Sequence, residues 1–501
     1  MKKSLLLASA LLCAASSFAQ DMTISPEGED VKRMTDPAQY EKFGEYELKN
    51  RWILSRNTDG SEVIDAFFQS EKNQASAVVL DTVIYVARPN NGSLLKFGLA
   101  TGRYLGELKL TMNGESIGTG ISVMLNLTKD DFGHLVYHGY KSSVGMTQEG
   151  EDKGGLKICY VSNIETGECA EVAELAPTLD ELINAYTPGR IDYTAIAGDI
   201  TRQDARAVVI AGAGVAGLQI YGWECEQGSD EWKGAFPDRD GGGNPDVIML
   251  APVAADGNVT QWSSAGGTSS AIVYDPEYTG ALFYIDGVGN MPGLYDRNGN
   301  FVENGTHHTE EVMNEETGTM TVNAVRNCET DWLVSASNAT GIIEFTLNGT
   351  NFVAYADGDH GATAIGGANA KIAKLGDNFE WTAEAGAKMA WAHVPAAGMG
   401  LDTDGGRRKI ILSASIMVDD NDVEGAYFLV GHNHNGMALY TIAPEGWQDP
   451  NGQVDGIEDI VADEVEGAAK YYNLQGVEVA NPENGLYIVK RGNKVAKELV
   501  K

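Results

Sequence analysis

Short runs in which apolar and polar residues alternate make up most of the chain between residues 46 and 446. Gly, Asn and Asp, which favour turns, separate these runs, and patterns of helical period are few and short. The clearest group lies in residues 76–110, with turn sequences such as Pro89-Asn90-Asn91-Gly92 between its runs. The runs are residues 77–80, 83–87, 94–98 and 104–110. Four antiparallel strands in about 35 residues are typical of one blade of a β-propeller.

Similar four-strand groups recur along the chain. We expect them at residues 121–173, 193–250, 269–302 and 323–356. The last group is expected to contain strands at residues 324–328, 332–336, 342–347 and 352–355. Residues 357–408 fit no group. They are either a long insertion or a further, degenerate blade.

A final group has only three runs, at residues 409–416, 426–430 and 437–442. Residues 46–54 supply the missing strand, because joining the first and last strands of the body closes the ring and protects its open edges. The pattern therefore predicts an all-β fold with a β-propeller over residues 46–446. The propeller has six blades, or seven if residues 357–408 form one more, and two stacked β-sandwiches are the competing architecture.

Residues 1–19 are typical of a secretory signal peptide. Lys2 and Lys3 precede the apolar run 5–15, and Ser17-Phe18-Ala19 offers small residues for cleavage. The apolar run is shorter than the roughly 20 residues that a bilayer requires, so we expect a cleaved signal and not an anchor. No later stretch is long and apolar enough for a transmembrane helix. We expect the mature protein to be secreted, periplasmic or on the outer cell surface.

The composition is strongly acidic, with 71 Asp and Glu residues against 36 Lys and Arg residues and a formal net charge of −35. Nucleic acids and anionic lipid surfaces require a basic face that displaces counterions, so this charge argues against both as partners. Self-repulsion of this size instead keeps an exported protein dispersed. Residues 20–45 are acidic and weakly apolar, which predicts a flexible lead-in to the body.

A linker and a small β-module are expected at the C-terminal end. Residues 447–469 combine a turn-rich stretch with an acidic one, which is typical of a linker. Apolar residues then alternate over residues 470–479, 485–489 and 494–497, with Gly at turns. This pattern predicts a meander of three or four strands over residues 470–501.

Two sequences in this module carry a resemblance: Tyr472-Asn473-Leu474-Gln475-Gly476 and Gly485-Leu486-Tyr487-Ile488-Val489, followed by a Lys-rich end. They resemble the C-terminal modules of secreted Bacteroidetes proteins that are related to the type IX secretion (Por) sorting domain. The signal ending in Phe18-Ala19-Gln20 is similar to signals of the same bacteria, and the body resembles their large propeller-type proteins of unknown function. The resemblance implies that residues 470–501 contact the secretion machinery.

A short motif fits the same resemblance. Asp81-Thr82-Val83 matches the O-glycosylation site of that phylum, an Asp followed by Thr or Ser and an aliphatic residue. Thr82 is therefore a candidate glycosylation site. An ordinary strand turn is the alternative interpretation.

Histidines and acidic residues near the end of the body are candidate metal ligands. His432 and His434 stand two positions apart, so a strand would place both imidazoles on one face. Asp419, Asp422 and Glu424 offer the hard oxygen ligands that calcium prefers. Polar turns are the alternative for both groups. We expect no other cofactor, because the sequence contains no defensible nucleotide-binding loop.

Exposed aromatic residues could stack on sugar rings. The candidates are Trp223, Trp262 and Trp391, which lie beside Gly-rich or polar segments, and packing between blades is the alternative. Four cysteines remain after the signal peptide, namely Cys159, Cys169, Cys225 and Cys328. An oxidising compartment would permit two disulfides among them. We interpret them mostly as small buried residues.

No Gly-x-Ser-x-Gly elbow or other nucleophile motif occurs in the sequence. We therefore expect a binding protein that recognises a glycan or another surface protein through a propeller face. The alternative is an extracellular hydrolase or lyase that acts on a polysaccharide or a peptide. Its ionisable side chains would then converge at the mouth of the propeller.

Overall fold

The structure is a computed structural model that describes a large part of the chain. The described residues are 40–55, 76–88, 92–117, 123–140, 156–175, 190–201, 206–214, 217–226, 228–229, 232–234, 248–250, 271–274, 282–286, 293–296, 301–302, 307–326, 341–356, 368–375, 390–394, 410–432, 436–451, 470–472, 478–479, 485–491 and 494–500. The expected signal peptide lies outside them. The chain divides into two compact units, Met1–Gln448 and Asp449–Lys501.

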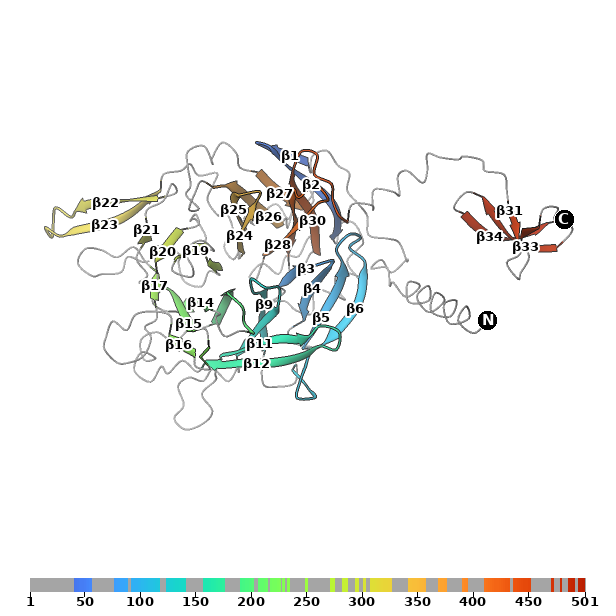
Figure 1. Ribbon diagram of the computed structural model, residues 1–501. Helices are drawn as coiled ribbons and strands as arrows, with labels where there is room; N and C mark the ends of the chain where they lie inside the picture. The colour runs from blue at the N-terminus through green and yellow to red at the C-terminus, as the bar shows by residue number, and fades with distance from the viewer. Residues whose placement is uncertain are drawn as a thin grey trace. The chain divides into compact units, whose positions relative to one another are not determined.

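The first unit is built from sheets that are almost entirely antiparallel and mostly follow chain order (Figure 1). The first sheet consists of β3 (Ala77–Leu80), β4 (Val83–Arg88), β5 (Ser93–Gly98) and β6 (Tyr104–Lys109). The second sheet consists of β9 (Val123–Lys129), β10 (Leu135–Tyr140), β11 (Leu156–Asn163) and β12 (Glu168–Leu175), extended by the short strands β7 (Thr111–Met112) and β8 (Glu115–Ser116).

Two further sheets continue this order. One consists of β13 (Arg190–Ala197), β14 (Arg206–Gly214), β15 (Gly217–Cys225) and β16 (Trp232–Gly234), with β17 (Ile248–Leu250) also paired to β15. The next consists of β18 (Ala271–Tyr274), β19 (Leu282–Asp286), β20 (Gly293–Asp296) and β21 (Phe301–Val302). These strands coincide with the groups that the sequence predicts.

For one predicted group of four strands, residues 323–356, the expected first and last strands are wrong. β24 (Ile342–Leu347) and β25 (Thr350–Ala356) begin a sheet and do not end one, and β26 (Ala368–Lys374) and β27 (Ala390–Val394) complete it. Its third and fourth strands therefore come from residues 357–408. β23 (Met320–Arg326), expected as the first strand, pairs instead with β22 (His307–Met313). Short strands of similar composition do not reveal where a group of four begins.

The last sheet joins the two ends of the unit. Its order is β1 (Tyr40–Phe43), β2 (Tyr46–Ser55), β30 (Gly436–Pro444), β29 (Glu424–His432) and β28 (Ile410–Val418). β2 pairs with β30 from Tyr46 opposite Pro444 to Ser55 opposite Gly436, as the sequence predicts. β1 belongs to the segment expected as the lead-in, and it extends this sheet by one edge strand.

One strand in each of six sheets, β3, β9, β13, β18, β24 or β28, contacts its counterparts in the two neighbouring sheets. We call these six the first strands of their sheets, and their contacts form a closed cycle. β3 contacts β9, β9 contacts β13, β13 contacts β18, β18 contacts β24, β24 contacts β28, and β28 contacts β3. The fold is thus all-β with a propeller-like arrangement of sheets, and all the regular elements among the described residues are strands. No helix in this described part is long and apolar enough to span a membrane.

The core of the first unit lies between neighbouring sheets. One large cluster of buried side chains joins residues of β2, β24–β26 and β28–β30, and a second joins the last sheet to β3–β5. Every residue of β30 from Gly436 to Ala443 is buried. A strand that is covered on both faces requires an apolar run rather than strict alternation, and this strand has one.

The second unit is a small sheet. It consists of β31 (Lys470–Tyr472), β32 (Glu478–Val479), β33 (Gly485–Arg491) and β34 (Lys494–Val500) in the order β32-β31-β33-β34. The longest pairing joins β33 and β34 from Gly485 opposite Val500 to Arg491 opposite Lys494. A small C-terminal β-sheet is thus present where the alternating pattern predicts one.

Candidate functional site

A tight turn between β9 and β10 carries the first candidate residues. Asp130 directly follows β9, and its Oδ1 accepts hydrogen bonds from the backbone N–H groups of Phe132 at 3.0 Å and His134 at 2.8 Å. Gly133 has a φ of 83°, which glycine adopts without the steric cost of a side chain. The Asp130 carboxylate therefore fixes the conformation of the turn.

The same turn is bonded to the neighbouring sheet. The other oxygen of Asp130, Oδ2, accepts a hydrogen bond from the backbone N–H of Ile200 at 3.0 Å. Asp131 Oδ2 accepts another from the backbone N–H of Gly198 at 2.7 Å. Gly198 and Ile200 directly follow β13, so the two carboxylates join the second and third sheets.

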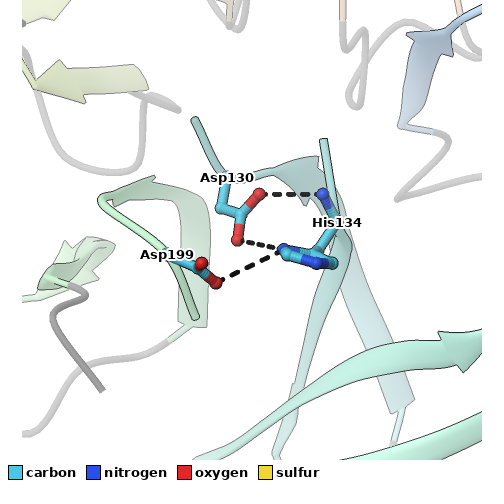
Figure 2. A group of neighbouring side chains, drawn as sticks. All are labelled: Asp130, His134 and Asp199. Atoms are coloured by element: carbon cyan, nitrogen blue, oxygen red, sulfur yellow. Dashed lines mark hydrogen bonds and ion pairs between the residues drawn. The ribbon is translucent and has the colours of Figure 1, made fainter. Parts of the chain in front are cut away.

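Asp130, His134 and Asp199 form a compact cluster at this junction (Figure 2). His134 Nδ1 lies 2.8 Å from Asp130 Oδ2 and 3.6 Å from Asp199 Oδ1. One ligand atom from each of the three residues lies within 4.8 Å of the other two. Both carboxylates are buried, whereas the imidazole is 33% exposed.

Backbone and hydroxyl groups hold the second carboxylate in place. Asp199 Oδ1 accepts hydrogen bonds from the backbone N–H of Thr201 at 2.9 Å and from its hydroxyl at 2.6 Å. A buried carboxylate needs such donors, because losing its hydration without them is costly. Nδ1 is the ring nitrogen that faces both carboxylates, and it lies at hydrogen-bond distance, 2.8 Å, from Asp130 Oδ2. The cluster thus presents one imidazole to two fixed anionic groups.

The exposed side of the turn is aromatic. Phe132 is 57% exposed, and it lies two residues before His134. The His134 ring also packs edge-on near the Tyr160 ring, with 6.0 Å between the ring centroids. An apolar ring therefore lies beside polar groups on a rigid turn.

The turn between β28 and β29 repeats this architecture with different residues. Asp419 Oδ1 accepts from the backbone N–H groups of Asn421 at 2.8 Å and Val423 at 3.0 Å, and Oδ2 accepts from the backbone N–H of Gln448 at 3.0 Å. Asp422 has a positive φ of 59°, and it occupies the position of Gly133, whose φ is 83°, in the first turn. Val423 occupies the place of His134. The second turn is therefore an internal reference for the first.

Three of the predicted metal ligands lie in or beside this second turn. Hydrogen bonds from the backbone N–H groups of Gln448 and Val423 hold the pKa of Asp419 below its usual range. Glu424 Oε2 accepts a bond from the backbone N–H of Asn348 at 2.6 Å, and Asp422 is exposed. The structure therefore gives Asp419 and Glu424 turn-building roles, and calcium binding there stays a prediction.

The remaining predicted site residues are placed only in part. His432 ends β29, Trp223 lies in β15 and Trp391 lies in β27, but their side chains, like all of His434 and Trp262, lie outside the described residues. Thr82 is exposed in the turn between β3 and β4. The metal, stacking and glycosylation roles of these residues stay predictions.

The cysteines that the structure describes are not bridged. Cys159, Cys169 and Cys225 are buried and form no disulfide, and Cys328 lies outside the described residues. Cys159 lies opposite Glu171, and Cys169 lies opposite Val161, so the two cysteines of this hairpin are offset along the strands. Burial raises the pKa of Cys169 to about 11.

A partly buried lysine links strands β9, β3 and β28. Lys129 ends β9, and its Nζ donates hydrogen bonds to the backbone carbonyls of Val79 in β3 at 3.1 Å and Ala414 in β28 at 2.8 Å. Burial lowers the pKa of Lys129 to about 8, and nearby Asp81 opposes this shift. The sequence does not single out this lysine, because its carbonyl partners come from two distant segments.

The Asp130 cluster was likewise not expected from the sequence. Its local signal is Asp130-Asp131-Phe132-Gly133-His134, an acid and a histidine four residues apart around a turn glycine. Asp199 joins them only through the packing of the second and third sheets. A search for acids and histidines around turn glycines would have found the first two residues and not the third.

No protein-family model matches the chain, and no curated protein matches its sequence. Among solved structures, the chain is similar to a DUF4623 family protein from Bacteroides eggerthii, with 10% identity and a TM-score of 0.44 over 77% of this chain and 74% of that one. It is also similar to a protein of unknown function from Bacteroides thetaiotaomicron, with 8% identity and a TM-score of 0.33 over 74% and 70% of the two chains. A Trypanosoma rangeli sialidase matches with 11% identity and a TM-score of 0.33 over 82% and 60%. Likenesses of this size assign no activity to the chain.

Proposed function

We propose that the protein is an exported or cell-surface binding protein that recognises a glycan with one face of a six-bladed propeller. The closed cycle of six first strands supports the number of blades. Within such a ring, the turns that join first and second strands lie together at one end. Hydrogen bonds between these turns support this arrangement. Asp130 accepts one from the Ile200 N–H after β13, and Glu424 accepts one from the Asn348 N–H in the turn between β24 and β25. We call this end the first-turn face.

The observation that carries the proposal is the exposed ring of Phe132 on this face. An exposed aromatic ring offers an apolar surface on which the C–H face of a sugar can stack. Asp131 and His134 lie in the same turn and provide polar groups for sugar hydroxyls. Because Asp130 and Asp131 fix the turn to the next sheet, little conformational entropy is lost on binding.

A glycan array tests this proposal with the mature wild-type protein and two variants. The Phe132→Ala protein is expected to bind at least about tenfold more weakly, because it loses the stacking surface. Asn421→Ala is the matched control, since Asn421 occupies the equivalent position of the second turn. It should bind as the wild type does. Absence of glycan binding by the wild type, or equal binding by all three proteins, would overturn the proposal.

The route to the surface is a separate part of the proposal. The signal-like residues 1–19 support export, and the Por-like sequences of residues 470–501 support recognition by the secretion machinery. Fractionation of the native bacterium should find the full-length protein outside the cytoplasm. A protein without residues 470–501 should accumulate in the periplasm. Cytoplasmic location of the full-length protein would contradict export.

A further inference from the structure

We propose that Asp130, His134 and Asp199 bind one divalent transition-metal ion, with Zn²⁺ as the probe of choice. Each residue offers one ligand atom, and the separations from His134 Nδ1 are 2.8 Å to Asp130 Oδ2 and 3.6 Å to Asp199 Oδ1. Ligands about 2.0–2.2 Å from an ion lie roughly 3–3.5 Å from one another. The cluster therefore has the spacing of a three-ligand site, and solvent reaches it on the histidine side.

The second turn shows which of these residues the fold itself requires. Asp419 closes its own turn and reaches Gln448 without a histidine, because Val423 stands where His134 stands in the first turn. The Asp130 carboxylate makes the same backbone bonds. His134 therefore adds nothing that the turn needs, and its approach to a second buried carboxylate, Asp199, requires another explanation.

Charge supplies that explanation. Two buried carboxylates face one imidazole ring. A divalent ion bound by Nδ1 and the two carboxylates would offset their negative charge. The ion would bind the Nδ1 lone pair, and the neutral imidazole would carry its single proton on Nε2. Asp130 Oδ2 keeps its bond from the Ile200 N–H, because each carboxylate oxygen has more than one acceptor direction.

The surrounding groups orient the ligands for this role. The backbone N–H groups of Phe132 and His134 hold Asp130, and the hydroxyl and N–H of Thr201 hold Asp199. Such bonds fix ligand orientation before the metal arrives. One nitrogen and two oxygen ligands suit Zn²⁺ or a similar transition ion. Calcium requires six to eight oxygens and fits the cluster poorly.

Titration calorimetry of the chelator-treated mature protein with Zn²⁺ tests the proposal. We expect a single site that binds one Zn²⁺ ion per protein chain. Zn²⁺ should also raise the melting temperature. His134→Val copies the second turn and should keep the fold while weakening Zn²⁺ binding by at least about 100-fold.

Two further variants keep the test decisive. Asp199→Asn removes a ligand without touching the turn, and it should weaken binding in the same way if His134→Val fails to fold. A protein with both His432→Ala and His434→Ala should bind Zn²⁺ as the wild type does, which separates this site from those two histidines. Unchanged Zn²⁺ affinity in His134→Val or Asp199→Asn would overturn the assignment.

Discussion

The indole Nε1 of Trp52 donates a hydrogen bond to the backbone carbonyl of Leu99 at 2.7 Å. Trp52 lies in β2 and is fully buried, whereas Leu99 lies in the turn between β5 and β6. The same indole covers Gly102, since a Cβ at that position would lie 2.9 Å from Trp52 Cδ2. The strand that closes the last sheet is therefore also fastened to the first sheet.

Gly102→Ala tests this contact between Trp52 and the first sheet. The φ of Gly102 is +67°, where an alanine costs about 1–2 kcal/mol, and the clash with Trp52 adds about 1–3 kcal/mol. Urea unfolding should show a loss of at least about 2 kcal/mol. Gly114→Ala is the matched control, because Gly114 has a φ of +80° with no atom near its Cβ position. If both variants lose the same stability, the contact with Trp52 has no energetic role.

The closing of the sheet could be predicted from sequence, but the phase of one group could not. The last group has only three runs where a blade has four strands, and residues 46–54 form an apolar strand that belongs to no other group. The sequence therefore predicts that the two ends of the body pair. No such imbalance marks the group around β24 and β25. Asn348-Gly349 correctly predicts their hairpin, with φ values of 48° and 73° that suit a type I′ turn. Nothing local states whether that hairpin begins or ends a sheet.

Contacts between sheets limit prediction of the site in the same way. The spacing of Asp130 and His134 is visible in the sequence, and so is the acidic turn at Asp419. Asp199 and Gln448 meet these turns only because neighbouring segments pack together. The sequence therefore offers similar acidic turns at Asp130 and Asp419, and the structure shows that the Asp130 turn faces a second carboxylate, Asp199.

Lys129 should make stability depend on pH above neutrality. Its pKa is about 8 in the folded protein, below the ordinary value of 10.5, because burial disfavours the charged amine. Between these values the unfolded chain binds more protons than the folded one, so stability rises as the pH rises from 8 to 10.5. Relative to Lys129→Met, the wild type should gain on the order of 3 kcal/mol across this window. Urea unfolding at pH 7.5 and 10 measures the difference, and parallel pH profiles would contradict it.

Asp419 should act at the opposite end of the pH scale. Backbone N–H bonds, first that of Gln448, lower its pKa from the ordinary 3.8, so the folded protein binds this proton more weakly than the unfolded chain. Its contribution to stability is complete above pH 3.8 and disappears as the pH falls through the lowered pKa. Melting temperatures between about pH 2.5 and 6 should therefore fall more steeply for the wild type than for Asp419→Asn. Equal slopes would mean that the turn bonds do not favour the ionised form.

Truncation of the C-terminal end should separate the body from the module at a defined residue. Trp447 packs on the body, with its ring centroid 6.2 Å from that of Tyr427 and its indole in the space that a Cβ at Gly425 would occupy. The Gln448 N–H also bonds to Asp419 Oδ2 at 3.0 Å. The second compact unit begins directly afterwards, at Asp449.

A chain that ends at residue 469 should therefore melt at nearly the wild-type temperature, because it loses only the separate module. A chain that ends at residue 445 also loses Trp447 and the Gln448 bond, and it should be less stable by about 2 kcal/mol or more. Calorimetry of the two truncated proteins beside the wild type makes the comparison. If the longer truncated protein also melts many degrees lower or aggregates, residues 470–501 supply part of the core, and their likeness to a sorting module is misleading.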